Sequence, residues 1–108
     1  MGAIAEVEPQ ELKRRLDEGE RPIILDVREP WEIAIASLPG TLNIPLQEVP
    51  SRLGELDRGA ELIVMCHGGG RSRRAAEFLA ARGFTRVANL SGGIDAWSRE
   101  VDPSLPTY

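Results

Sequence analysis

The chain has 108 residues, of which 42% are hydrophobic and 28% are charged, and its formal net charge at pH 7 is −4. This size and composition indicate one soluble domain over residues 1–108, with a core large enough to fold without a metal or a disulfide. The negative charge argues against nucleic-acid binding. The single cysteine excludes an internal disulfide, and with only one histidine beside it we expect no structural metal.

The first twelve residues, MGAIAEVEPQEL, lack a basic stretch followed by an apolar one, so we expect no signal peptide. No apolar run in the sequence approaches the roughly 20 residues that a membrane-spanning helix needs. We therefore predict a cytoplasmic protein without a membrane partner.

The first half of the chain contains five predicted elements. A helix at 9–19 has a proline near its first position, leucines four residues apart and a glycine that can end it. A short apolar strand at 22–27 follows, and then a helix at 29–36 that starts at a proline. A brief strand between prolines at 39–46 and a short helix at 48–56 complete this half.

The second half begins with the most apolar segment, 61–66, which predicts a central strand. An amphipathic helix at 72–82, a strand at 86–90 and a helix at 92–100 follow it. Strands and helices alternate throughout, which predicts a mostly parallel sheet with helices on both faces. Ligands of such sheets bind at the carboxyl ends of the strands, where the sequence has ILDVR and IVMCHGGGR.

The only cysteine, Cys66, ends the apolar strand and precedes a glycine-rich turn. A lone cysteine in such a place is usually a small buried hydrophobic residue. Here, however, the glycines at 68–70 allow a tight turn with inward-pointing N–H groups, and a predicted helix begins at Ser72. Arg71 adds a permanent positive charge. These features favour an anion above Cys66, beginning with its own thiolate, and so predict a nucleophile.

Other polar side chains near the two strand ends leave alternatives open. Asp26 and Arg28 either support the active loop or form a structural ion pair that fixes the turn into the next helix, and we favour the ion pair. His67 either faces the substrate or faces solvent. Arg73 and Arg74 either make the mouth of the site basic or are solvated helix charges.

Two tryptophans and a pair of glycines have structural interpretations. Trp31 and Trp97 stand at apolar positions of two predicted helices, so we expect both to pack in the core. Gly92 and Gly93 predict a turn into the last helix and not a phosphate-binding loop.

Long segments of the chain resemble the rhodanese-like domain family. ILDVREPWEIAIASLPGTLNIPL resembles its first signature, VMCHGGGRSRRAAEFLAARGFTRVANLSGGIDAWSRE resembles its active loop and second signature, and DPSLPTY is typical of its C-terminal tail. One departure is Ser37, at a structural position where the family usually has a histidine. The resemblance implies a three-layer sandwich around a mostly parallel, five-stranded sheet.

The resemblance also implies the chemistry of a sulfurtransferase. Cys66 would take the outer sulfur of thiosulfate or another small anionic donor, become a persulfide, and pass the sulfur to cyanide or a thiol. A protein sulfur carrier is a further candidate partner, and no cofactor or metal is implied. Arg71 would bind the sulfonate of the donor. The residues expected to bind the substrate are His67, Gly68, Gly69, Gly70, Arg71 and Ser72.

Two other functions remain open on this fold: a cysteine phosphatase or arsenate reductase, and a binding module without catalysis. The phosphatase relatives have five residues between the cysteine and the arginine, whereas only four separate Cys66 from Arg71. The shorter loop suits a compact sulfur better than a tetrahedral oxyanion. Non-catalytic relatives commonly lose the cysteine, which this chain keeps. We therefore predict a sulfurtransferase.

Overall fold

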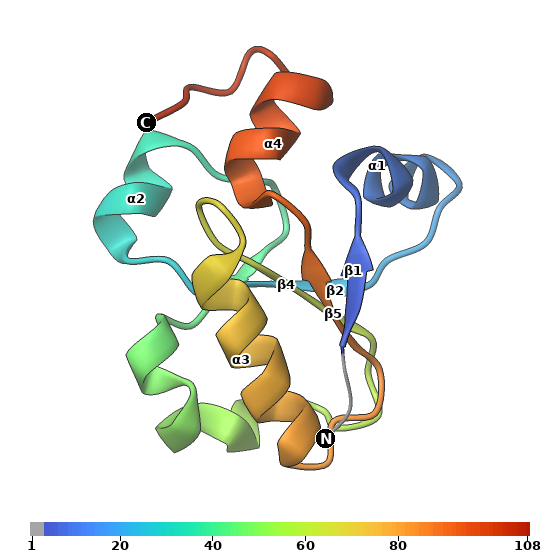
Figure 1. Ribbon diagram of the computed structural model, residues 1–108, viewed down its shortest axis with the longest axis vertical. Helices are drawn as coiled ribbons and strands as arrows, with labels where there is room; N and C mark the ends of the chain where they lie inside the picture. Colours follow the sequence, from blue (N-terminus) through green and yellow to red (C-terminus); the bar gives the residue numbers. More distant parts are fainter. Residues whose placement is uncertain (1–3) are drawn as a thin grey trace.

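Short apolar runs of the sequence form a five-stranded sheet in the computed structural model, which describes residues 4–108 (Figure 1). The strands are β1 (Ala5–Val7), β2 (Ile23–Asp26), β3 (Leu42–Asn43), β4 (Leu62–Met65) and β5 (Val87–Leu90). All neighbouring strands are parallel, and their order is β1-β5-β4-β2-β3. The apolar β4 is central, as predicted, whereas the short edge strand β1 was not predicted.

Each predicted helix has a counterpart at about the predicted place, and one of them is divided in two. They are α1 (Pro9–Asp17), α2 (Pro30–Ile35), α3 (Gly70–Ala81) and α4 (Gly93–Glu100), and the predicted short helix at 48–56 is a pair of 3-10 helices, η1 (Leu46–Glu48) and η2 (Pro50–Glu55). α3 begins two residues earlier than predicted, inside the glycine-rich turn. No helix within residues 4–108 has the length and apolarity to cross a membrane.

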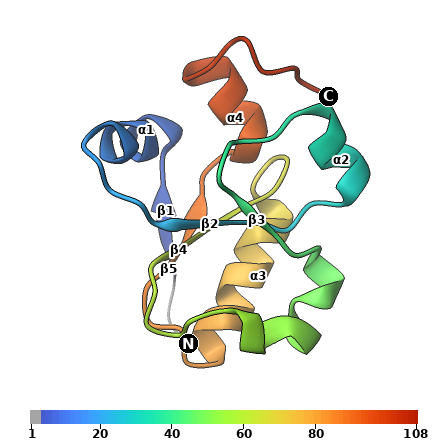
Figure 2. The ribbon, with the colours of Figure 1, turned by 180° about the vertical axis from the view of Figure 1, so that it is seen from behind.

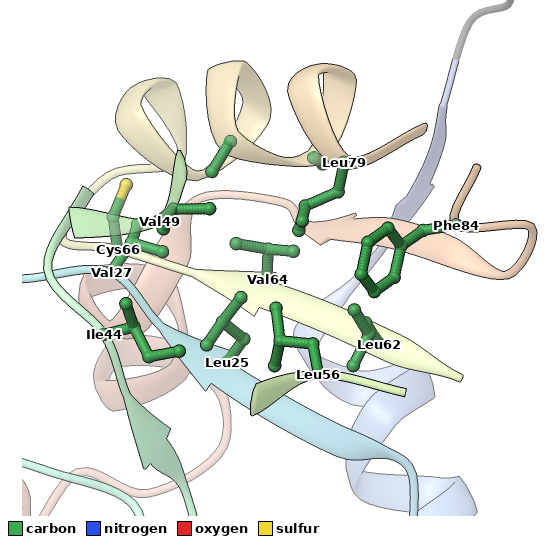
Figure 3. Packing of buried hydrophobic residues seen from close by; sticks show 12 residues of the cluster. Leu25, Val27, Ile44, Val49, Leu56, Leu62, Val64, Cys66, Leu79 and Phe84 are labelled. Atoms are coloured by element: carbon green, nitrogen blue, oxygen red, sulfur yellow. The ribbon is translucent and has the colours of Figure 1, made fainter. Parts of the chain in front are cut away.

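The helices cover both faces of the sheet, so the predicted three-layer architecture is confirmed (Figure 1). α3 and the 3-10 helices pack on one face, and α1 and α4 pack on the other. Side chains of β4 alternate between the two faces of the sheet and so contribute to the hydrophobic cluster on each face. Figure 3 shows Leu62, Val64 and Cys66 in a row on the α3 side of the strand, while Ile63 and Met65 belong to the opposite cluster.

α2 and the C-terminus lie together near the carboxyl end of the sheet (Figure 2). Trp97 is buried in α4, as predicted. The prediction that Trp31 packs in the core is wrong, because its side chain is 63% exposed. α2 has only six residues, and the Trp31 ring lies beside the Tyr108 ring in a T-shaped arrangement instead of against the sheet.

Candidate active site

The loop from Cys66 to Arg71 leads from the central strand β4 into α3, and the thiol lies at its base. Cys66 is buried, at 1% exposure, as expected for a cysteine that only fills the core. Its Sγ is nevertheless not in a purely apolar place. The backbone N–H of Gly69 donates to Sγ over 3.1 Å, and Ser72 Oγ lies 3.3 Å from it.

The glycines give the loop a conformation that other residues rarely adopt. Gly69 is the N-cap of α3 with φ of +106°, in the left-handed region. A helix N-terminus therefore begins directly above the thiol, with partial positive charge from its free N–H groups. Gly68 and Gly70 are exposed and form the outer surface of the turn.

The first turn of α4 holds the loop from the β5 side by backbone contacts. The N–H of Ile94 donates to the carbonyl of Cys66 over 2.9 Å, and the N–H of Asp95 donates to the carbonyl of His67 over 3.0 Å. A Cβ atom at Gly93 would lie 2.4 Å from each of those carbonyl oxygens. Gly92 and Gly93 both have positive φ and form the predicted turn into the last helix.

A polar chain runs from the thiol to β1. Ser72 is fully buried and its hydroxyl lies 2.5 Å from Asn89 Oδ1. The amide nitrogen of Asn89 donates to the carbonyl of Gly69 and to the Glu6 carboxylate, so the amide oxygen faces Ser72. Because a hydroxyl has one proton, Ser72 can donate either to Asn89 or to the sulfur. No local pattern in the sequence marks Asn89 or Glu6 as part of the site.

Arg71 stands at the end of the loop, as expected, but it is not a free cation. Its Nη1 and Nη2 donate to the two carboxylate oxygens of Glu32, each over 2.8 Å. The Arg71 side chain is 32% exposed, whereas the Glu32 side chain is 3% exposed. The acid therefore holds the guanidinium from inside and leaves one part of it accessible.

Glu32 has the most hydrogen-bonding partners of the acids of the site, although it was not among the predicted site residues. Besides Arg71, it accepts the backbone N–H of Glu29 over 3.0 Å and the hydroxyl of Tyr108 over 2.9 Å. The hydrogen bonds from Arg71 lower the pKa of the Glu32 carboxyl to about 2, against the opposing effect of burial. Glu32 is thus charged at neutral pH.

Tyr108, the last residue of the chain, covers one side of the loop. Its ring stacks on His67 with centroids 4.1 Å apart and planes inclined by 13°. The Trp31 ring lies at 72° to it, with centroids 6.1 Å apart. Burial raises the pKa of the Tyr108 phenol, so the hydroxyl keeps its proton. His67 therefore lies against the aromatic ring, and its Nε2 is buried 4.0 Å from Asp95.

Asp26 and Arg28 form a completely buried ion pair, with 2.8 Å between Nη2 and Oδ2. Arg28 also donates to the carbonyls of Glu32 and Ala36 and to the Tyr108 hydroxyl. All five of its N–H groups thus have acceptors. Within residues 4–108 none of these bonds reaches the Cys66 loop directly, and the pair fixes the turn into α2.

The predicted site residues therefore separate into two groups. Cys66, Gly69 and Ser72 are in direct contact, while Arg71 and His67 turn to partners that the sequence analysis had not selected. Of the two alternatives left open for Arg73 and Arg74, solvated helix charges fit Arg74, which is exposed, while Arg73 pairs with Glu6 over 2.9 Å. The one signal for Tyr108 was the DPSLPTY tail, and local patterns gave none for Glu32. In the described residues no three His, Cys, Asp or Glu side chains are grouped as metal ligands.

Comparison with known proteins decides the family. The model of the rhodanese-like domain matches residues 8–100. The chain belongs to the rhodanese-like domain family. A sulfurtransferase of Allochromatium vinosum is 35% identical over 100 residues, which cover 93% of this chain and 94% of that protein. The solved structure of a human single-domain sulfurtransferase has a TM-score of 0.81 and 29% identity, covering 92% of this chain and 98% of its own.

Some relatives are much longer than this rhodanese-like domain. The chain is 37% identical to the adenylyltransferase and sulfurtransferase MOCS3-1 of Zea mays, and the match covers 96% of this chain but only 24% of that protein. Relatives of similar length that are named sulfurtransferases support a transferase role for the domain.

Proposed function

We propose that this rhodanese-like domain moves a sulfane sulfur from a thiosulfate or persulfide donor to a thiol or cyanide, through a persulfide on Cys66. The observation that carries the proposal is the surroundings of Sγ, which accepts the N–H of Gly69 over 3.1 Å below the N-terminus of α3. Both features favour negative charge on the sulfur. A cysteine that only fills the core needs neither.

The proposed reaction has two balanced steps. In the first, the Cys66 thiolate attacks the outer sulfur of the donor, the S–S bond of the donor breaks, and the electron pair leaves with sulfite or with the donor thiolate. In the second, the acceptor attacks the outer sulfur of the persulfide, and Cys66 leaves as a thiolate. The sulfane sulfur keeps its oxidation state, so no further oxidant or reductant enters the balance.

The residues around Cys66 have separate roles in this proposal. The loop from His67 to Gly70 would surround the outer sulfur of the persulfide. The Ser72 hydroxyl would donate to Cys66 Sγ when that sulfur is negatively charged. Arg71 has five N–H groups, of which two are bound to Glu32 within residues 4–108, so the others can meet a donor. A small thiol, cyanide or a protein sulfur carrier would accept the sulfur.

Steady-state assays with thiosulfate, glutathione persulfide and para-nitrophenyl phosphate test this function. The wild type should transfer sulfur and leave the phosphate ester essentially untouched, because its loop is one residue shorter than that of the phosphatase relatives. Cys66→Ser should transfer no sulfur, and an extra glycine after Gly70 should impair transfer. Phosphate-ester hydrolysis by the wild type without sulfur transfer from any donor would overturn the proposal, and so would sulfur transfer by Cys66→Ser.

A further inference from the structure

Carboxylates balance part of the positive charge beside the Cys66 loop. Three arginines, Arg71, Arg73 and Arg74, end or follow the loop in the sequence, an arrangement that could attract anionic donors. In the structure, however, Arg71 pairs with Glu32 over 2.8 Å and Arg73 pairs with Glu6 over 2.9 Å, while Arg74 is exposed.

The pair at the mouth, Arg71 with Glu32, matters most for the donor. Glu32 engages Arg71 through both oxygens and is itself nearly inaccessible. A donor that approaches the accessible part of Arg71 meets hydrogen-bond donors, but the fixed negative charge behind them cancels much of the attraction for an anion. A dianion such as thiosulfate loses more from this cancellation than a donor with an uncharged organic group.

The same side of the site offers apolar surface. Trp31 and Ile35 are the exposed large hydrophobic side chains of the described residues, at 63% and 38% exposure, and both belong to α2. Trp31 adjoins the ring of Tyr108, which in turn stacks on His67, the neighbour of Cys66. A continuous aromatic surface thus leads from solvent to the loop.

We propose that Glu32, Tyr108 and Trp31 determine the choice of donor, so that the domain prefers the persulfide of an organic thiol to thiosulfate. This inference rests on the sulfur-transfer function proposed above. The loading step is R–S–SH + Cys66–S⁻ → Cys66–S–SH + R–S⁻, in which the donor S–S bond breaks, a new one forms at Sγ and the electron pair leaves with the donor thiolate. The aromatic surface would contact the group R.

The test is the rate at which each donor loads sulfur onto Cys66, followed by intact mass in single turnover. Three donors separate charge from apolar contact: thiosulfate, 2-hydroxyethyl persulfide and benzyl persulfide. The wild type should load fastest from benzyl persulfide and slowest from thiosulfate. A wild type that loads faster from thiosulfate than from either persulfide would overturn the inference.

Single substitutions test whether Glu32 and Trp31 cause the preference for an organic persulfide over thiosulfate. Glu32→Gln should raise the loading rate from thiosulfate relative to benzyl persulfide by about tenfold, because Arg71 regains its uncompensated charge. Glu61→Gln is the matched control, since Glu61 pairs with Arg15 at the opposite end of β4. Trp31→Ala should lower the rate from benzyl persulfide relative to thiosulfate by roughly three- to tenfold. Unchanged ratios in both Glu32→Gln and Trp31→Ala would also overturn the inference.

The source of the organic persulfide is distinguished by a further donor, a short peptide with one persulfidated cysteine. Loading from the peptide faster than from 2-hydroxyethyl persulfide indicates a protein donor, and the reverse indicates a small thiol, with the preference over thiosulfate required in both cases. Failure of the underlying function gives a different result, because then no donor loads sulfur onto Cys66 at all.

Discussion

The Cys66 loop is held from two sides, and the two sides use different kinds of contact. On the α4 side the contacts are made by the backbone: the N–H groups of Ile94 and Asp95 bind loop carbonyls, and Gly93 leaves no room for a side chain. On the α2 side the contacts are made by side chains: Glu32 pairs with Arg71, and Tyr108 stacks on His67.

This difference separates the shape of the loop from its charge. Backbone contacts fix the position of the loop independently of its side chains. A substitution that disrupts the contacts on the α4 side should therefore impair sulfur transfer from every donor. Side-chain contacts can change without moving the backbone, so changes on the α2 side should alter which donor is used.

The largest expected effect is the loss of stability that follows when the buried Arg28–Asp26 pair beside α2 is broken. Arg28→Leu leaves Asp26 buried without its cation and removes donors to α2 and to Tyr108. Loss of one partner of such a pair typically costs about 3–5 kcal/mol in free energy of unfolding, measurable by urea denaturation. Arg52→Leu, which breaks exposed pairs on η2, should cost less than about 1 kcal/mol. Equal losses in the two variants would contradict the distinction.

The second-largest expected effect is the loss of stability in acid, which protonates Glu32 and breaks its pair with Arg71. The pKa of Glu32 is about 2 in the folded protein and 4.5 as its ordinary value, so its stabilising contribution is present above pH 4.5 and disappears as the pH falls toward 2. Between about pH 5 and pH 2 the wild type should lose up to about 3 kcal/mol more stability than Glu32→Gln. Urea denaturation of both proteins across this range measures the difference. Parallel pH profiles would show that the pair does not stabilise the fold.

The prediction for the α4 side concerns the rate of sulfur transfer. Gly93→Ala should lower the rate of sulfur transfer from thiosulfate and from glutathione persulfide alike, by roughly tenfold or more, because its Cβ displaces the carbonyls of Cys66 and His67. Gly54→Ala is the control, since no atom lies within 4 Å of a Cβ there. A Gly93→Ala protein that loses one donor and keeps the other would reverse the assignment of the two sides.

Local patterns in the sequence were sufficient for most of the fold. Apolar runs and proline positions predicted β2, β4, β5 and the helices because those features act over a few residues. β1 was not predicted because it has only three residues, two of which are exposed, and because it pairs only with β5 at the edge of the sheet. The start of α3 was misplaced because Gly69, which reads as part of a turn, is also the helix N-cap.

The candidate site was predicted only where its residues are neighbours in the chain. Cys66, Gly69 and Ser72 lie within seven consecutive residues, at the end of β4, in the turn and in the first turn of α3, so their spacing brings them together. Arg71 and Glu32 are 39 positions apart, and Arg28 and Tyr108 are 80 apart. Such pairs depend on how α2 and the C-terminal tail lie against the loop, and one sequence contains no local signal for that arrangement.

The central claim is that Cys66 carries the sulfur, and intact mass spectrometry tests it most directly. The protein is incubated with a donor, freed of excess donor, and measured before and after addition of a thiol or cyanide. The wild type should gain the mass of one sulfur atom and lose it to the acceptor, while Cys66→Ser should gain none. Equal sulfur uptake by Cys66→Ser, or a sulfur on the wild type that no acceptor removes, would contradict the account.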